Sequence, residues 1–189
     1  MISAILLAAG QSKRMNGENK LIKKINGEPL INHSIKNILE SSIDKLIIIT
    51  GYENEVLQKI INKNHKIKII FNNKFKTGMA SSIKIGIKSL PEYTKSFFIC
   101  LADMPMVNKQ IYDYLIKHAD NKEIIVPTYK KQQGNPVLFS ITMIEEIMNI
   151  EGDVGAKEIL KKNKNKILNL PIDDQAILKN YNTLDSFSN

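Results

Sequence analysis

Short runs of β-branched and apolar residues alternate along the chain with segments of helical periodicity. The runs are typical of strands, and the segments between them place their apolar residues on one face. The alternation argues for a largely parallel α/β sheet. The expected strands are Ile2–Leu7, Lys45–Thr50, Ile67–Asn72, Ser96–Leu101, Glu123–Pro127 and Ile167–Leu170. The expected helices are Pro29–Ser41, Asn54–Asn62, Ser81–Leu90, Lys109–His118, Ile141–Met148 and Ala156–Lys162.

Two stretches depart from this alternation. Asn26-Gly27 is a tight-turn signal and predicts a small hairpin. Later in the chain, Lys130–Asn135 is expected to be a polar loop, and Pro136–Phe139 is a short apolar run. Ligands of such sheets bind outside the carboxyl ends of the strands, near the switch in strand order. The residues that directly follow strands are therefore the candidates for a site.

Composition favours one soluble domain. The chain has 189 residues, of which 43% are hydrophobic and 24% are charged. No apolar run approaches the ~18 residues that cross a bilayer, so no membrane partner is expected. The N-terminal segment lacks a basic region and is expected to be a first strand instead of a signal peptide. Cys100 is the only cysteine, which excludes an intramolecular disulfide and a zinc cluster and favours a cytoplasmic protein.

The formal net charge of +8 raises the question of nucleic-acid binding. The lysines are spread along the chain, there is no tryptophan, and aromatic residues are not interleaved with arginines. We therefore expect no nucleic-acid partner. A general attraction for small anionic substrates is the better interpretation of the charge.

The stretch from Ile5 to Lys20 is the first candidate site. An apolar run ends in Ala8-Ala9-Gly10, small residues that let a ligand approach the backbone closely. The polar loop that follows carries Arg14, the chain's single arginine, whose planar guanidinium matches phosphate oxygens. Loop amides and cations at a strand end favour a polyphosphate ligand. The alternative is a surface loop with chance cations, and the loop is neither a Walker motif nor GxGxxG.

Asp103 is the second candidate. It ends the buried run FFICLAD, and Pro105 stops regular structure just after it. A carboxylate at the carboxyl end of a strand, facing a phosphate-binding loop, suits a hard cation such as Mg²⁺. The alternative is an aspartate that caps the next helix.

Three weaker motifs follow. In NNKFKTGMASS, Gly78 permits a tight turn, and Ser81 or Ser82 could cap the next helix. QQGNPVLF, from Gln132 to Phe139, and GDVGAKEIL, starting at Gly152, combine glycines with amides or carboxylates. All three could be only turn and cap chemistry, and Gly152-Asp153 is a reasonable helix start.

Together these strings resemble the molybdenum cofactor cytidylyltransferase family, a branch of the MobA-like NTP transferases. The resemblance rests on LAAGxSxRM followed by Asn-Lys, on ADMP, and on QGNPVLF and GDVGAK, and it covers nearly the whole chain. It implies a single-domain, three-layer α/β/α Rossmann-like fold with a mostly parallel central sheet, of the nucleotide-diphospho-sugar transferase type. Asn16-Gly17 departs from the usual Met-Gly, and the closing stretch LKNYNTLDSF is a weak match.

The resemblance also implies roles for single residues. Arg14, Lys20 and Asp103 are the implied catalytic residues, and Asp103 is the implied ligand of Mg²⁺, with Asn182 as a second metal ligand. The implied nucleotide-binding residues are Leu7, Ala8, Ala9, Gly10, Arg14, Lys20, Gly78, Ser82 and Asp103. The implied substrate-binding residues are Gln133, Asn135 and Asp153.

The implied reaction transfers CMP from CTP to the molybdopterin cofactor and releases pyrophosphate. A recipient molybdoenzyme is then a possible partner. LAAG goes with the cytidylyl branch and LAGG more often with the guanylyl branch, so the preference for CTP depends mainly on Ala9. GTP as the nucleotide, or a sugar or alditol phosphate as the acceptor, stays an alternative. A non-catalytic chaperone that carries the finished cofactor is an alternative of another class.

Overall fold

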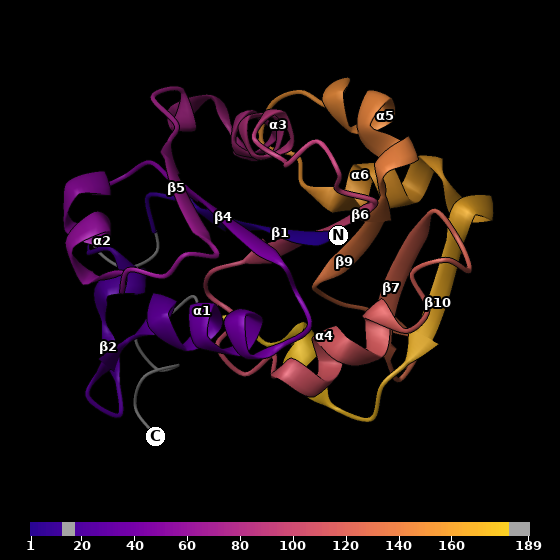
Figure 1. The fold of residues 1–189 in the computed structure, drawn as a ribbon, viewed down its shortest axis with the longest axis horizontal. Helices are drawn as coiled ribbons and strands as arrows, with labels where there is room; N and C mark the ends of the chain where they lie inside the picture. Colours follow the sequence, from indigo (N-terminus) through magenta and orange to yellow (C-terminus); the bar gives the residue numbers. More distant parts are fainter. Residues whose placement is uncertain (13–17, 182–189) are drawn as a thin grey trace.

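A mixed sheet forms the centre of the molecule (Figure 1). The structure, a computed structural model, describes residues 1–12 and 18–181. Within these ranges eight strands belong to the sheet: β1 (Ile2–Ala8), β4 (Lys45–Thr50), β5 (Ile67–Phe71), β6 (Ser96–Leu101), β7 (Ile124–Tyr129), β8 (Gln132–Gln133), β9 (Val137–Ser140) and β10 (Ile167–Pro171). Their order is β5-β4-β1-β6-β9-β7-β10, and β8 pairs with β7. A separate hairpin consists of β2 (Lys24–Ile25) and β3 (Glu28–Pro29).

The strand order reverses next to β1. The chain runs outward from β1 through β4 to β5, and then returns to place β6 on the other side of β1. These four strands are parallel, and Leu6 on β1 lies opposite Ile48 and Cys100 on its two neighbours. The carboxyl ends of β1 and β6 therefore flank the switch point, where ligands of open α/β sheets bind.

Helices cover both faces of the sheet and complete the three layers (Figure 1). On one face lie α1 (Leu30–Glu40), α2 (Asn54–Ile60) and α4 (Lys109–Ile116). On the other lie α3 (Met79–Lys88), α5 (Ile144–Met148) and α6 (Ala156–Lys162). Because side chains alternate along a strand, Ile5 packs with α3 and Leu6 packs with α1. The predicted α/β fold is thus confirmed.

Short 3₁₀ turns connect several elements: η2 (Lys20–Ile22), η3 (Phe75–Thr77), η4 (Ile141–Met143), η5 (Lys164–Lys166) and η6 (Gln175–Leu178). None of the helices among the described residues is long and apolar enough to cross a membrane. Cys100 lies in the core, as expected, where burial raises the pKa of its thiol to about 12.

The region after β7 differs most from expectation. The stretch Lys130–Asn135, expected to be a loop, begins with a turn in which Lys130 and Lys131 have φ of 48° and 68°, and continues into β8. The short apolar run becomes β9, which lies antiparallel between β6 and β7. Apolar periodicity cannot reveal this reversal, because a buried strand has the same pattern in either direction.

The start of α3 also differs from the prediction. The predicted helix from Ser81 begins at Met79, with Gly78 at the N-cap, so Ser81 and Ser82 lie inside the helix and do not cap it. Instead, the Ser81 hydroxyl donates to the carbonyl of Gly78. The Asn26-Gly27 hairpin is confirmed, with φ of 52° and 83° at its two turn residues.

Candidate active site

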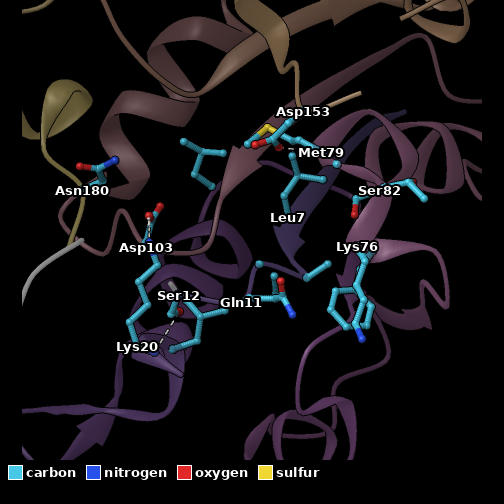
Figure 2. A pocket seen from close by; sticks show the side chains of 18 residues that line it. Leu7, Gln11, Ser12, Lys20, Lys76, Met79, Ser82, Asp103, Asp153 and Asn180 are labelled. Carbon is cyan, nitrogen blue, oxygen red and sulfur yellow. Dashed lines mark hydrogen bonds and ion pairs between the residues drawn. The ribbon is translucent and has the colours of Figure 1, made fainter. Parts of the chain in front are cut away.

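A cavity of about 650 Å³ opens at the carboxyl ends of β1 and β6 (Figure 2). Its lining includes the end of β1 with the loop after it, the start of η2, the residues from η3 into α3, and Asp103 beyond β6. Two residues from the later part of the chain, Asp153 and Asn180, complete it. The cavity therefore coincides with the switch point of the sheet.

The β1 end presents bare backbone to the cavity. Ala8 and Ala9 are buried. Two hydrogen bonds hold the backbone of this strand end in place, from Tyr52 N to Ala9 O (3.3 Å) and from Ala102 N to Leu7 O (3.2 Å). A Cβ atom added at Gly10 would meet no heavy atom within 4 Å. Open space next to an exposed main chain is what a close-fitting ligand requires.

Ser12 connects the start of the loop after β1 to the start of η2. It has φ of 51°, and its Oγ accepts a hydrogen bond from the backbone N of Lys20 at 3.2 Å. Residues 13–17, which include Arg14, lie outside the described residues. The role expected for Arg14 therefore stays a prediction.

Lys20 and Asp103 form an ion pair across the cavity floor (Figure 2). The Lys20 ammonium donates to Asp103 Oδ2, and the two side chains are only 17% and 13% exposed. Lys20 begins η2, which Asn19 caps by accepting from Leu21 N at 3.1 Å. Because both charges are largely shielded from water, each is a strong potential partner for a ligand charge of opposite sign.

The opposite wall is the N-terminal turn of α3. Here the segment 152–153 satisfies two backbone donors that the helix cannot satisfy itself. Asp153 Oδ1 accepts from Met79 N at 3.2 Å, and Gly152 O accepts from Ala80 N at 3.1 Å. Gly78 has φ of 114°, and a Cβ atom there would come within 2.4 Å of the Gly152 carbonyl. Asp153 was expected to start the helix after it, but it caps α3, while Gly155 precedes α6.

The structure brings together most of the site residues predicted from the sequence. The predicted residues that line the cavity are Leu7, Ala8, Ala9, Gly10, Lys20, Gly78, Ser82, Asp103 and Asp153. Gln133 and Asn135 are not part of the lining. Gln133 is exposed and donates to Asn169 Oδ1 at 2.8 Å, and the Asn135 backbone N donates to Ile177 O at 2.9 Å. Their contact with a substrate stays a prediction.

Asn180 was not among the predicted site residues, yet it lines the cavity beside Asp103 (Figure 2). The next residue, Tyr181, fixes this arrangement by donating its backbone N to the carbonyl of Asp103 at 2.8 Å. The sequence offered a weak signal, because Asn180 stands in the closing motif, but the metal ligand expected there was Asn182. That residue lies outside the described residues.

The oxygen donors at the cavity suit a hard divalent cation. Among residues 1–12 and 18–181, no group of three or more His, Cys, Asp or Glu side chains could enclose a metal. Asp103 offers one carboxylate, with the amide of Asn180 on the same side of the cavity. Mg²⁺ commonly binds through one or two carboxylates together with substrate phosphates, so this sparse donor set fits it.

Comparison with known proteins agrees with this geometry. The sequence model of the MobA-like NTP transferase domain matches residues 4–167. A probable molybdenum cofactor guanylyltransferase of Thermococcus sibiricus is 30% identical over 136 residues, which cover 70% of this chain and 65% of that protein. The molybdenum cofactor cytidylyltransferase of Escherichia coli is 31% identical over 140 residues, covering 74% of this chain and 70% of that protein.

Solved structures share the fold. Rv0371c from Mycobacterium tuberculosis superposes with a TM-score of 0.87 at 20% identity, over 99% of this chain and 95% of that chain. A complex of the same mycobacterial protein with manganese gives a TM-score of 0.83 at 19% identity, over 99% and 96% of the two chains.

Proposed function

Because this chain belongs to the family of MobA-like NTP transferase domains, we propose that it transfers a nucleotidyl group from an NTP to the molybdopterin cofactor. We further propose CTP as the nucleotide. The observation that carries the proposal is the shielded Lys20–Asp103 pair beside the bare backbone of Gly10. A cation, a carboxylate and open main chain at one strand edge are what a metal-bound triphosphate needs.

The chemistry is a direct displacement at the α-phosphorus. An oxygen of the terminal phosphate of the pterin attacks in line and forms the new P–O bond. The bond between the α-phosphorus and the bridging oxygen to the β-phosphate breaks, and that oxygen leaves with pyrophosphate. Such a transfer depends on positioning and charge stabilisation and needs no covalent enzyme intermediate. Lys20 supplies positive charge to the triphosphate, and Arg14 is expected to do the same for the leaving pyrophosphate.

Asp103 and Asn180 would hold Mg²⁺, with Asn182 as a further expected ligand. When bound, the ion screens the negative charge of the triphosphate. Lys20 compensates the Asp103 charge in the structure, so the cavity floor already has one positive and one negative partner for a metal–triphosphate complex. Gln133, Asn135 and Asp153 are proposed to contact the pterin.

The preference for CTP is supported by the LAAG motif, in which Ala9 stands where the guanylyl branch more often has glycine, and Ala9 lines the cavity. The relatives include both guanylyl- and cytidylyltransferases, so GTP is the competing nucleotide. A sugar or alditol phosphate is the competing acceptor.

Pyrophosphate release tests the proposal. The protein is incubated with Mg²⁺, or with Mn²⁺ in parallel, and with each of the four nucleotides, with and without molybdopterin. We expect release with CTP only when the pterin is present. Release with GTP alone among the nucleotides would contradict the choice of base, and release with a sugar or alditol phosphate instead of the pterin would contradict the acceptor. Pterin binding without release from any nucleotide would favour a cofactor chaperone.

A further inference from the structure

Asn72 is a fully buried polar residue directly after β5, beside the α3 wall of the cavity. Its Oδ1 accepts from the backbone N of Lys74 at 2.9 Å. A backbone N–H can only donate, so this bond fixes which end of the amide is oxygen. The amino group consequently faces α3, where Nδ2 donates to Ser81 Oγ at 2.8 Å and to Ser82 Oγ at 3.0 Å.

The two serines use their own protons differently. The Ser81 hydroxyl lies 2.8 Å from Gly78 O and 3.2 Å from Lys74 O, so its proton has backbone acceptors. Ser82 is only 4% exposed and lines the cavity. Within the described part of the chain, the one hydrogen bond of the Ser82 side chain is the bond that its Oγ accepts from Asn72. In Figure 2 its oxygen points from α3 into the cavity.

A serine hydroxyl can normally rotate to act as donor or acceptor towards a ligand. At Ser82 the hydrogen bond from Asn72 occupies one of the two acceptor lone pairs, so the O–H proton is directed away from Asn72 and is free to face the cavity. We propose that Asn72 is a positioning residue that holds the Ser82 hydroxyl as a hydrogen-bond donor to an acceptor atom on the nucleoside part of the bound NTP. This inference rests on the proposed function, because it requires that the cavity binds a nucleotide.

Asn72→Asp tests the inference with almost no change in shape. A carboxylate oxygen still accepts from Lys74 N, but both donors towards the serines are lost. The Ser82 proton then turns to the carboxylate and away from the ligand. Loss of one neutral hydrogen bond should raise KM for the nucleotide about threefold to tenfold, with kcat unchanged within about twofold. Ser82→Ala should raise KM to a similar extent.

Two controls separate positioning from a general effect on the fold or the charge. Ser81→Ala removes the other partner of Asn72 and should leave KM unchanged. The double variant Asn72→Asp/Ser82→Ala should have about the KM of either single variant, because both changes remove the same bond. Additive effects in the double variant, or an unchanged KM in Asn72→Asp, would overturn the inference. Thermal unfolding of each variant confirms that the compared proteins are folded.

Assays of the unaltered protein distinguish failure of the proposed function from failure of this inference. If it neither binds an NTP nor releases pyrophosphate, the proposed function fails before any variant is made. If it is active and Ser82→Ala has an unchanged KM, the inference alone fails. Inhibition by inorganic triphosphate should be equal in the unaltered and Ser82→Ala proteins. Weaker inhibition of the variant would place the contact on phosphate and overturn the inference.

Discussion

The two parts of the chain reach the cavity in different ways. Up to β6 and Asp103, the lining residues lie at the ends of strands, in the segments that follow them or at the start of the next helix, and the parallel sheet brings them together. Beyond β6, Asp153 and Asn180 reach the cavity from segments that sheet pairing does not place there. Asp153 is held by the N-terminus of α3, and Asn180 by the bond from Tyr181 to Asp103.

This difference shows that the later part of the site depends on the earlier part. The bonds that position Asp153 and Asn180 end on backbone atoms of Met79 and Asp103, which belong to the first part. Gln133 and Asn135, in contrast, make their described bonds to residues of the later part, near β10 and η6. Substitutions in the first part should therefore affect chemistry most, and substitutions at the contacts between the parts should affect stability.

Lys20→Ala should give the largest effect. Removing a preorganised charge from a shielded site commonly lowers kcat by about 10²–10³, and we expect a loss of that size in pyrophosphate release. Lys23→Ala is the matched control, because Lys23 lies on the same segment, pairs with Glu18 at 2.6 Å and does not line the cavity. A Lys20→Ala protein with a near-normal rate would remove Lys20 from the mechanism.

Gly78→Ala tests the contact between the two parts. A Cβ atom at φ of 114°, within 2.4 Å of the Gly152 carbonyl, forces the segment 152–153 away from α3. We expect the free energy of unfolding to fall by about 2 kcal/mol. Gly10→Ala is the contrasting variant, since its Cβ atom meets nothing within 4 Å. It should unfold as the unaltered protein does in urea, but bind nucleotide more weakly. Equal unfolding curves for the two variants would contradict the contact.

The fold could be predicted from the sequence wherever a single element carried its own signal. Strand runs such as Lys45–Thr50 and the turn at Asn26-Gly27 are local patterns, and the structure confirms them. The direction of β9 is not a local property, because it depends on which strands lie beside it. The start of α3 was misplaced because two serines near a helix start resemble caps, whereas the actual cap comes from Asp153, more than seventy residues later.

The residues of the candidate site also differ in whether a local pattern predicts them. Gly10 and Asp103 follow strands, so the rule for parallel sheets places them at one edge and the structure brings them to one cavity. Asn180 could not be placed, because its position depends on a backbone bond between residues 103 and 181. No periodicity or motif spacing contains that information.

Asp153→Ala should have a moderate effect on stability. It removes the side-chain acceptor for Met79 N, and loss of a helix cap costs about 1 kcal/mol. Asp153→Asn keeps an acceptor oxygen and should restore most of this stability in urea unfolding.

Gln133→Ala is the control, because it removes an exposed side chain and should leave the unfolding curve unchanged. If Asp153 also contacts the pterin through its charge, Asp153→Asn will raise KM for the pterin while stability stays near normal. Equal stability of Asp153→Ala and the unaltered protein would contradict the cap.

The smallest effect is expected at a more exposed lysine–carboxylate pair, Lys166–Glu146, which joins η5 to α5. The hydrogen bond from Lys166 lowers the pKa of Glu146 below its ordinary value of 4.5. A lowered folded-state pKa stabilises the protein above the unfolded value and loses that contribution as the pH falls through the folded value. Its side chains are 32% and 40% exposed, against 17% and 13% for Lys20–Asp103, so water and salt screen it more.

Glu146→Gln should therefore lower the thermal midpoint slightly at pH 7 and in low salt. The difference from the unaltered protein should shrink as the pH falls below 4.5, the ordinary glutamate pKa, and should vanish once Glu146 is itself protonated in the folded protein. A difference that grows on acidification would reverse the assigned sign of the pKa shift. A loss at pH 7 as large as that of Gly78→Ala would show that the later part of the chain depends on its own surface pairs more than on its contact with α3.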